Sequence, residues 1–168
     1  MKMLRTRKNV RLRGYNYSNA GVYFVTICIK DGHEMLGDVV VGDAPLRVPH
    51  VQFSEYGIFV DAQVQKINDI YPHVFLDNYT IMPNHVHLLM SIQDGMRGGA
   101  SPTKALIPQV VQSLKSMTTK QFGFSMWQRS YHDHIIRTKE EYQRIWKYID
   151  KNPARWTEDC YYNPITKG

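Results

Sequence analysis

The sequence predicts an α+β domain in which helices pack on an antiparallel sheet. Segments typical of strands and helices follow each other in the order strand, two short strands, helix, strand, strand, helix, strand, helix. Two of these strands are joined by a two-residue turn, which is how antiparallel neighbours connect. With 168 residues and 43% hydrophobic content, the chain has the size and composition of one globular domain.

The first strands are runs of β-branched and aromatic residues bounded by turn residues. Residues 22–29 (VYFVTICI) form such a run, and Lys30-Asp31-Gly32 ends it, which predicts a central strand. Two shorter runs at 37–41 and 47–53 flank the turn-forming residues 42–45. These runs predict a hairpin or an irregular excursion.

A helix and a hairpin are predicted next. Ser54 can cap a helix that ends before Pro72. Its apolar residues recur at helical spacing, and they are Tyr56, Phe59, Val60, Val64, Ile67 and Ile70. Residues 75–82 are then predicted as a strand, Pro83-Asn84 as a turn, and residues 85–92 (HVHLLMSI) as the returning strand.

The second half of the chain adds two helices and one strand. Ser101-Pro102 provides the N-cap and first turn of a helix. Its apolar stripe consists of Leu106, Ile107, Val110, Val111, Leu114 and Met117. Residues 132–137 are predicted as a strand. Thr138 and Glu141 then form a capping box at the start of a last helix, which extends to about Lys151.

The chain is basic, with a net charge of +6 and a pI near 9.3. Its first thirteen residues carry six positive charges, including Arg11 and Arg13, and no acid. This arm, residues 1–13, is a candidate phosphate-binding segment, although a solvated tail without a specific partner explains it equally well. We expect one domain over residues 14–156 and a short tail over residues 157–168.

The composition argues against several protein classes. No uninterrupted apolar run reaches the roughly 18 residues of a membrane span, and the basic N-terminus lacks the apolar centre of a secretory signal. Cys28 and Cys160 lie far apart and outside any CxxC pattern, which argues against a disulfide framework and a thiolate zinc site. We expect a soluble, cytoplasmic protein with no membrane partner, and Cys28 packed in its strand.

Two H-x-H pairs are candidates for a metal site. His85 and His87 lie two residues apart in a predicted strand, so both side chains point to the same face. The same spacing recurs at His132 and His134. The sequence does not decide which pair binds metal, whether all four imidazoles cluster, or whether the pairs are polar residues on a solvent-facing sheet surface.

The last helix offers a nucleophile and a further ligand. Its apolar stripe consists of Tyr142, Ile145, Trp146 and Ile149. Tyr148 lies about 100° from the centre of that stripe, at the boundary between core and solvent. Asn152 shares a face with Tyr148 if the last turn stays helical, but Pro153 biases Asn152 away from helical geometry. Without the histidines, Tyr148 is most simply an amphipathic boundary residue.

Three strings of residues together resemble a known family. They are Tyr79 to Leu89 (YTIMPNHVHLL), Trp127 to Tyr131 (WQRSY) leading to HIIR at 134–137, and Tyr148 to Pro153 (YIDKNP). In this order they closely resemble the REP-associated tyrosine transposases, relatives of the single-tyrosine insertion-sequence transposases. The pattern at 13–18, the strand at 22–29 and the residues at 37–39 are also similar, so the resemblance spans about residues 11 to 156.

This resemblance implies a ferredoxin-like HUH nuclease core. The implied activity is cleavage and rejoining of single-stranded DNA beside hairpin, REP-like elements through a 5′-phosphotyrosine. Tyr148 is implied as the nucleophile, His85 and His87 as the metal ligands, and Asn152 as the third protein ligand. The implied cofactor is a divalent metal, Mg²⁺ or Mn²⁺, and the implied partner is single-stranded or hairpin DNA, bound by a monomer or a homodimer.

Basic side chains flank the predicted active helix and suit the phosphates of unpaired DNA. The candidate DNA contacts are Arg11, Arg13, Arg129, His134, Lys147, Lys151 and Arg155. The main alternative is a catalytically silent regulatory protein that binds hairpin DNA on the same scaffold. A plasmid relaxase or rolling-circle initiator is disfavoured by the short chain, and a metal-binding module with no DNA partner is a further alternative.

Overall fold

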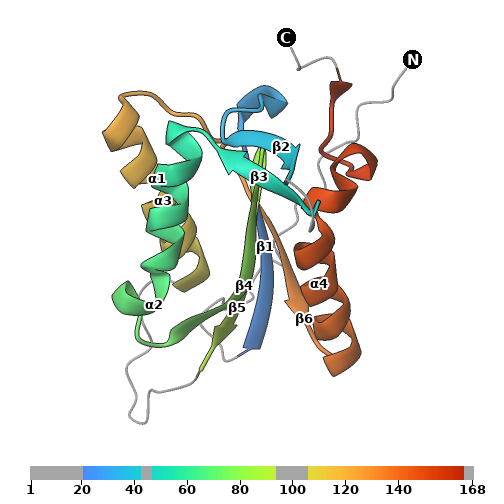
Figure 1. Cartoon of the computed structure of the whole chain (residues 1–168). Coiled ribbons are helices and arrows are strands. Elements are labelled where there is room, and N and C mark those ends of the chain that lie inside the picture. The colour runs from blue at the N-terminus through green and yellow to red at the C-terminus, as the bar shows by residue number, and fades with distance from the viewer. Residues whose placement is uncertain (1–20, 43–46, 94–105, 165–168) are drawn as a thin grey trace, which may run out of the picture.

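A computed structural model describes residues 21–42, 47–93 and 106–164 (Figure 1). The predicted basic arm, including Arg11 and Arg13, lies outside the described residues. The predicted helix start at Ser101-Pro102 and part of the turn at 42–45 also lie outside them.

A four-stranded antiparallel sheet forms the centre of the molecule, with the strand order β4-β5-β1-β6. These strands are β1 (Gly21–Cys28), β4 (Val74–Met82), β5 (His85–Ile92) and β6 (His132–Ile136). β1 pairs with β5 along its whole length and with β6 on its other side, so β1 and β5 are central. The four strands predicted from the sequence are thus confirmed to within one residue at each end, and Cys28 is buried in β1.

Helices cover both faces of this sheet (Figure 1). α1 (Glu55–Gln65), the short α2 (Ile67–Ile70) and α3 (Leu106–Phe122) lie on one face, and α4 (Lys139–Lys151) lies on the other. The core elements follow in the order β1, α1, β4, β5, α3 and β6. This order, together with the strand order of the sheet, is the ferredoxin-like arrangement. The α+β fold with a ferredoxin-like sheet is therefore confirmed.

The ferredoxin-like core carries small additions near one end of the sheet. A short η1 (Lys30–Gly32) follows β1, and the predicted hairpin is present as β2 (Gly37–Val41) and β3 (Pro49–Phe53). A final turn, η2 (Pro153–Glu158), follows α4 and contacts β3. Figure 1 shows the hairpin reaching from the α1 side of the molecule toward η2.

The helix predicted between Ser54 and Pro72 is interrupted at Lys66. The Ser54 side chain caps its start by accepting a hydrogen bond from the Gly57 N–H, as expected. The Lys66 N–H donates to the Gln63 carbonyl at 3.2 Å, a tight turn that separates α1 from α2. At the start of α4, Thr138 Oγ1 accepts from the Glu141 N–H at 3.1 Å, which is one half of the predicted capping box.

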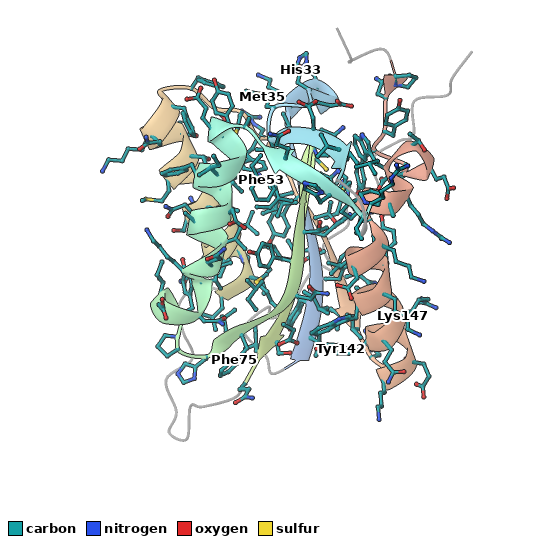
Figure 2. The ribbon with its side chains drawn as sticks, in the orientation of Figure 1. His33, Met35, Phe53, Phe75, Tyr142 and Lys147 are labelled. Atoms are coloured by element: carbon teal, nitrogen blue, oxygen red, sulfur yellow. The ribbon has the colours of Figure 1, made fainter. Side chains whose placement is uncertain are left out.

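The two faces of β5 differ in chemistry. Its even-numbered residues from Val86 to Ile92 belong to the main core under α1 and α3. On the opposite face, Leu89 packs with Ile136, Ile145 and Ile149 in a smaller core under α4. Side chains fill both interlayer spaces (Figure 2). The polar end of β5, with His85 and His87, faces the same side of the sheet as α4. None of the helices in the described part of the chain is both long and apolar enough to cross a membrane.

Candidate functional site

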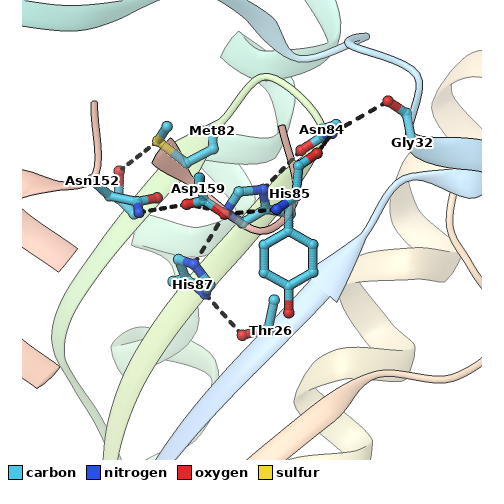
Figure 3. Close-up of polar contacts among 10 residues, drawn as sticks. Thr26, Gly32, Met82, Asn84, His85, His87, Asn152 and Asp159 are labelled. Atoms are coloured by element: carbon cyan, nitrogen blue, oxygen red, sulfur yellow. Dashed lines mark hydrogen bonds and ion pairs between the residues drawn. The ribbon is translucent and has the colours of Figure 1, made fainter. Parts of the chain in front are cut away.

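His85 and His87 form a buried pair on the α4 side of β5. Their relative exposures are 0% and 1%, and their Nε2 atoms lie 3.1 Å apart (Figure 3). Alternation along the strand places both rings on one face, as predicted. Their burial excludes the interpretation that they are polar residues on a solvent-facing sheet surface.

Asn84 fixes the orientation of the His85 ring. Its Nδ2 donates to the Gly32 carbonyl at 3.2 Å and to the Tyr161 carbonyl at 2.8 Å, so its Oδ1 faces the ring. His85 Nδ1 lies 2.8 Å from that oxygen and donates to it. Because the ring proton sits on Nδ1, the Nε2 lone pair of His85 is available to a cation.

Thr26 plays the corresponding part for His87. The two residues are paired across β1 and β5, and Thr26 Oγ1 lies 2.8 Å from His87 Nδ1. Burial lowers the pKa of His87 well below its usual value, and the neighbouring His85 lowers it further. Burial also lowers the pKa of His85 to about 4, with the charge of Asp159 opposing the shift. Both imidazoles are therefore neutral at neutral pH, the state in which they ligate metals.

Asp159, which lies just after η2, joins the two histidines. Its side chain is 1% exposed, and its Oδ2 lies 4.0 Å from His85 Nε2. One donor atom from each of Asp159, His85 and His87 lies within 4.8 Å of the others. Sequence reasoning missed this residue and placed it in the tail at 157–168. The available signal was its position among Trp156, Tyr161 and Tyr162, since aromatic residues seldom cluster in a solvated tail.

Asn152 remains helical, with φ −58° and ψ −45°, so the expectation that Pro153 would move it out of helical geometry is wrong. The chain tightens into η2 instead, with Pro153 in its first turn and the Asn152 N–H bonded to the Ile149 carbonyl. Asn152 Nδ2 donates to Asp159 Oδ2 at 2.8 Å. Its Oδ1 is buried and has no hydrogen-bond partner among the described residues.

Tyr148 lies one helical turn before Asn152, at the edge of the histidine pair. Its ring centroid is 5.4 Å from that of His87 and 6.2 Å from that of Phe24. The residue is 40% exposed, which confirms the predicted position between core and solvent. Burial raises the pKa of Tyr148 to about 12, with the charge of Asp159 as the next cause, so the phenol is protonated at neutral pH.

A basic pocket opens beside Tyr148. Its volume is about 270 Å³, and it is lined by Arg144, Lys147, Tyr148, Lys151, Asn152 and Arg155. Three of its four positive residues were predicted DNA contacts, and Arg144 was not. Lys147 points away from the sheet on the outer side of α4 (Figure 2). The pocket therefore combines positive charge with the tyrosine and the buried amide.

The other candidates lie apart from this pocket. His134 hydrogen-bonds Glu141 at the start of α4, and His132 lies opposite Thr26 on β6. Neither belongs to the donor group found among the described residues. Arg129 precedes β6 and does not line the pocket. Trp156 is buried against the His85 ring, with centroids 5.9 Å apart.

The donors suit a divalent cation. Two imidazole nitrogens from β5 and one carboxylate oxygen from the residue after η2 converge, and the amide of Asn152, at the end of α4, contacts that carboxylate. Two donors on one ion at about 2.1 Å and a right angle lie about 3 Å apart, which the 3.1 Å between the Nε2 atoms matches. Imidazole donors suit transition-metal cations, and carboxylate oxygens suit Mg²⁺ and Mn²⁺, so the donors themselves do not select one metal.

No protein-family model matches the chain. A Haemophilus influenzae protein described as uncharacterized is 30% identical, over 93% of each chain. Among solved structures, a REP-associated tyrosine transposase bound to a REP hairpin matches with a TM-score of 0.60 and 17% identity, over 87% of this chain and 73% of that chain. A proposed transposase from Deinococcus radiodurans gives a TM-score of 0.42 and 22% identity, over 84% of this chain and 95% of that chain. The chain thus belongs to one family with the Haemophilus influenzae protein and has the fold of the REP-associated tyrosine transposase.

Proposed function

We propose that this protein is a metal-dependent transposase that cleaves and rejoins single-stranded DNA beside hairpin elements, with Tyr148 as its nucleophile. The observation that carries the proposal is the meeting of Tyr148, a buried histidine pair and a basic pocket at one end of the sheet. The structure with the same fold was solved with a REP hairpin, which supports hairpin DNA as the partner.

The chemistry is a transfer between two phosphodiesters. The phenolic oxygen of Tyr148 attacks the scissile phosphorus, the bond to the 3′-oxygen breaks, and the proton of the phenol is lost as the 3′-hydroxyl gains one. The products are a 5′-phosphotyrosine and a free 3′-hydroxyl. Because one phosphoester bond replaces another, the bond energy is retained. A 3′-hydroxyl can later attack the phosphotyrosine and rejoin the strand without ATP.

His85, His87 and Asn152 would hold the divalent cation. When bound, this cation would supply positive charge to the non-bridging phosphate oxygens. His85 would present its Nε2 lone pair because its Nδ1 donates to Asn84 Oδ1, and Thr26 Oγ1 can accept from Nδ1 of His87 when Nε2 of that ring binds the cation. The buried Oδ1 of Asn152 is the remaining neutral oxygen donor.

The residues around Tyr148 would position the phosphate. Lys147, Lys151 and Arg155 line the pocket and would pair with phosphates on either side of the cleaved bond. The high pKa of Tyr148 keeps the phenol protonated before DNA binds. A neutral phenol is a weak nucleophile, so attack would require local positive charge that favours the phenolate.

Covalent adduct formation tests this proposal directly. Labelled single-stranded hairpin oligonucleotides are incubated with Mn²⁺ and protein, and denaturing gels are scored for a protein–DNA adduct. Wild type and Tyr162→Phe, a control that removes the hydroxyl of a nearby tyrosine packed edge to face against Trp156, should form the adduct, whereas Tyr148→Phe should not. Tight hairpin binding without an adduct, across a broad oligonucleotide panel, would instead favour the silent regulatory protein.

A further inference from the structure

Asp159 carries a buried carboxylate that forms no ion pair with a Lys or Arg of the described residues. Two hydrogen bonds satisfy part of it, since Asn152 Nδ2 donates to Oδ2 at 2.8 Å and the Tyr161 N–H donates to Oδ1 at 2.9 Å. Its ionic neighbour among the described residues is His85, whose Nε2 lies 4.0 Å from Oδ2. An isolated buried charge is costly, so this position calls for a cation.

The distances allow Asp159 and the histidines to share one ion. Two donors bound to the same ion at about 2.1 Å can lie at most about 4.2 Å apart. The 3.1 Å between the histidine Nε2 atoms and the 4.0 Å from His85 Nε2 to Asp159 Oδ2 are both within this limit. The donor atoms of His85, His87 and Asp159 all lie within 4.8 Å of one another. A shift below 1 Å therefore brings the remaining pair, His87 and Asp159, within the limit for two donors on one ion.

Asp159 also belongs to a segment that is wrapped around the histidines. The Tyr161 ring lies 4.4 Å from the His85 ring and 6.0 Å from the His87 ring, between centroids. The Tyr161 carbonyl accepts a hydrogen bond from Asn84, the residue that orients His85. Trp156, in the same segment, is buried with its ring centroid 5.9 Å from that of His85. A bond from Asp159 to the metal would therefore fasten a segment that already contacts both histidines.

We propose that Asp159 is a ligand of the metal, and that metal binding fastens residues 153–164 onto β5 as part of the site. This inference rests on the metal site of the proposed function and adds a charged ligand from the end of the chain. In the metal-free protein, the carboxylate leaves negative charge where a DNA phosphate has to approach. Bound metal neutralises that charge. Metal binding therefore fastens the segment and allows the DNA phosphate to approach the pocket in the same step.

Metal titration of the full chain without DNA tests the inference. Isothermal titration with MnCl₂ is compared for wild type, Asp159→Asn, His87→Ala and Glu158→Gln. Glu158 is the matched control, because it is an exposed neighbour and its variant loses the same charge. We expect Glu158→Gln to bind Mn²⁺ like wild type, and Asp159→Asn to bind at least about tenfold more weakly, as loss of a metal-site partner does.

Thermal unfolding separates a ligand from a merely structural residue. If the carboxylate is an uncompensated charge, metal-free Asp159→Asn should have a Tm equal to or above that of wild type. Mn²⁺ should then raise the Tm of wild type and Glu158→Gln much more than that of Asp159→Asn. Addition of Mn²⁺ should slow hydrogen exchange at residues 153–164 in wild type and Glu158→Gln, but not in Asp159→Asn.

Two outcomes would overturn the inference. Mn²⁺ binding that is lost in His87→Ala but unchanged in Asp159→Asn would remove Asp159 from the ligands and leave the proposed function standing. A lower Tm of metal-free Asp159→Asn, with no loss of Mn²⁺ affinity, would make the residue purely structural. Conversely, weakened Mn²⁺ binding in Asp159→Asn without any DNA adduct in wild type would support the inference and contradict the proposed function.

Discussion

Each of the two buried histidines is oriented by a neighbour that occupies its Nδ1. Asn84 accepts from His85, and the hydroxyl of Thr26 lies against His87. In metal sites such partners fix the tautomer and the direction of the ring, and their loss typically costs about 10 to 100-fold in metal affinity. The Asn84 amide donates in turn to the carbonyls of Gly32 in η1 and of Tyr161 after η2. The hydrogen bonds that orient the His85 ring therefore extend from β5 to both of these segments.

Thr26→Val should weaken metal binding without unfolding the protein. Valine keeps the shape and suits a strand, but it leaves the Nδ1 of a buried imidazole without its partner. We expect Mn²⁺ to bind about tenfold more weakly in a calorimetric titration. Thr80→Val is the control, because Thr80 lies opposite His87 on β4 but its hydroxyl bonds to Met82. Equal affinities for both variants would contradict the role given to Thr26.

At the scale of elements, the docking of α4 decides where Tyr148 lies. A bulge in β4 between Leu76 and Asn78 interrupts the pairing with β5 at Asp77. The Asp77 carboxylate accepts a hydrogen bond from the Tyr142 hydroxyl at 2.9 Å, and Asn78 Nδ2 donates to Asp150 Oδ1 at 2.9 Å. Tyr142 lies between α4 and the sheet in Figure 2. These contacts hold α4 on both sides of Tyr148.

The contact of α1 with the segment before β2 depends on a glycine. A Cβ on Gly57 would lie 2.0 Å from the Leu36 carbonyl oxygen, which is closer than any allowed contact. Alanine is normally better than glycine in a helix by about 1 kcal/mol. We nevertheless expect Gly57→Ala to lower the free energy of unfolding by about 2 kcal/mol, as overpacking does. Urea unfolding checks this, and a variant as stable as wild type would show that α1 does not pack so closely.

The sequence predicted elements well where their patterns were long and periodic. β5 and α4 were predicted with nearly their observed ends, because HVHLLMSI is bounded by a turn and α4 has both a cap and a stripe. The break at Lys66 was missed, since the apolar period continues through it. Trp146, predicted in the stripe of α4, is 36% exposed, and the residues that α4 contributes to the small core are Ile145, Ile149 and the partly buried Tyr142.

The candidate site was only partly predictable. The shared face of His85 and His87 and the position of Tyr148 follow from local periodicity, so both could be predicted from the sequence. Asp159 could not be found in this way, because its place depends on how the chain folds back after η2. The geometry of Asn152 was misjudged because a local proline rule was outweighed by the hydrogen bond to Asp159 and by the continuing turn.

At the scale of the whole molecule, part of the positive charge of the chain lies where the proposal needs it. Four positive side chains line the pocket beside Tyr148, in a protein with a net charge of +6. Such a pocket should bind DNA through phosphates, with little dependence on base sequence. Affinity should therefore fall as salt concentration rises.

Lys151→Gln should reduce that salt dependence. For single strands, each phosphate contact contributes about 0.7 to the slope of log affinity against log salt, and the variant should lose about one contact. Fluorescence anisotropy with a labelled single strand gives the slope at several salt concentrations. Lys139→Gln, an exposed change at the first residue of the same helix and outside the pocket, should keep the wild-type slope. Identical slopes for both variants would place the DNA elsewhere.

The central claim is that Tyr148 becomes covalently attached to DNA, and peptide mapping of the adduct tests it most directly. Wild type is reacted with a hairpin oligonucleotide and Mn²⁺, then digested with protease and nuclease, and the modified peptide is sequenced by mass spectrometry. We predict a nucleotide 5′-phosphate on Tyr148. Tyr161 also lies beside the histidines, so attachment there, or at any residue other than Tyr148, would contradict the account.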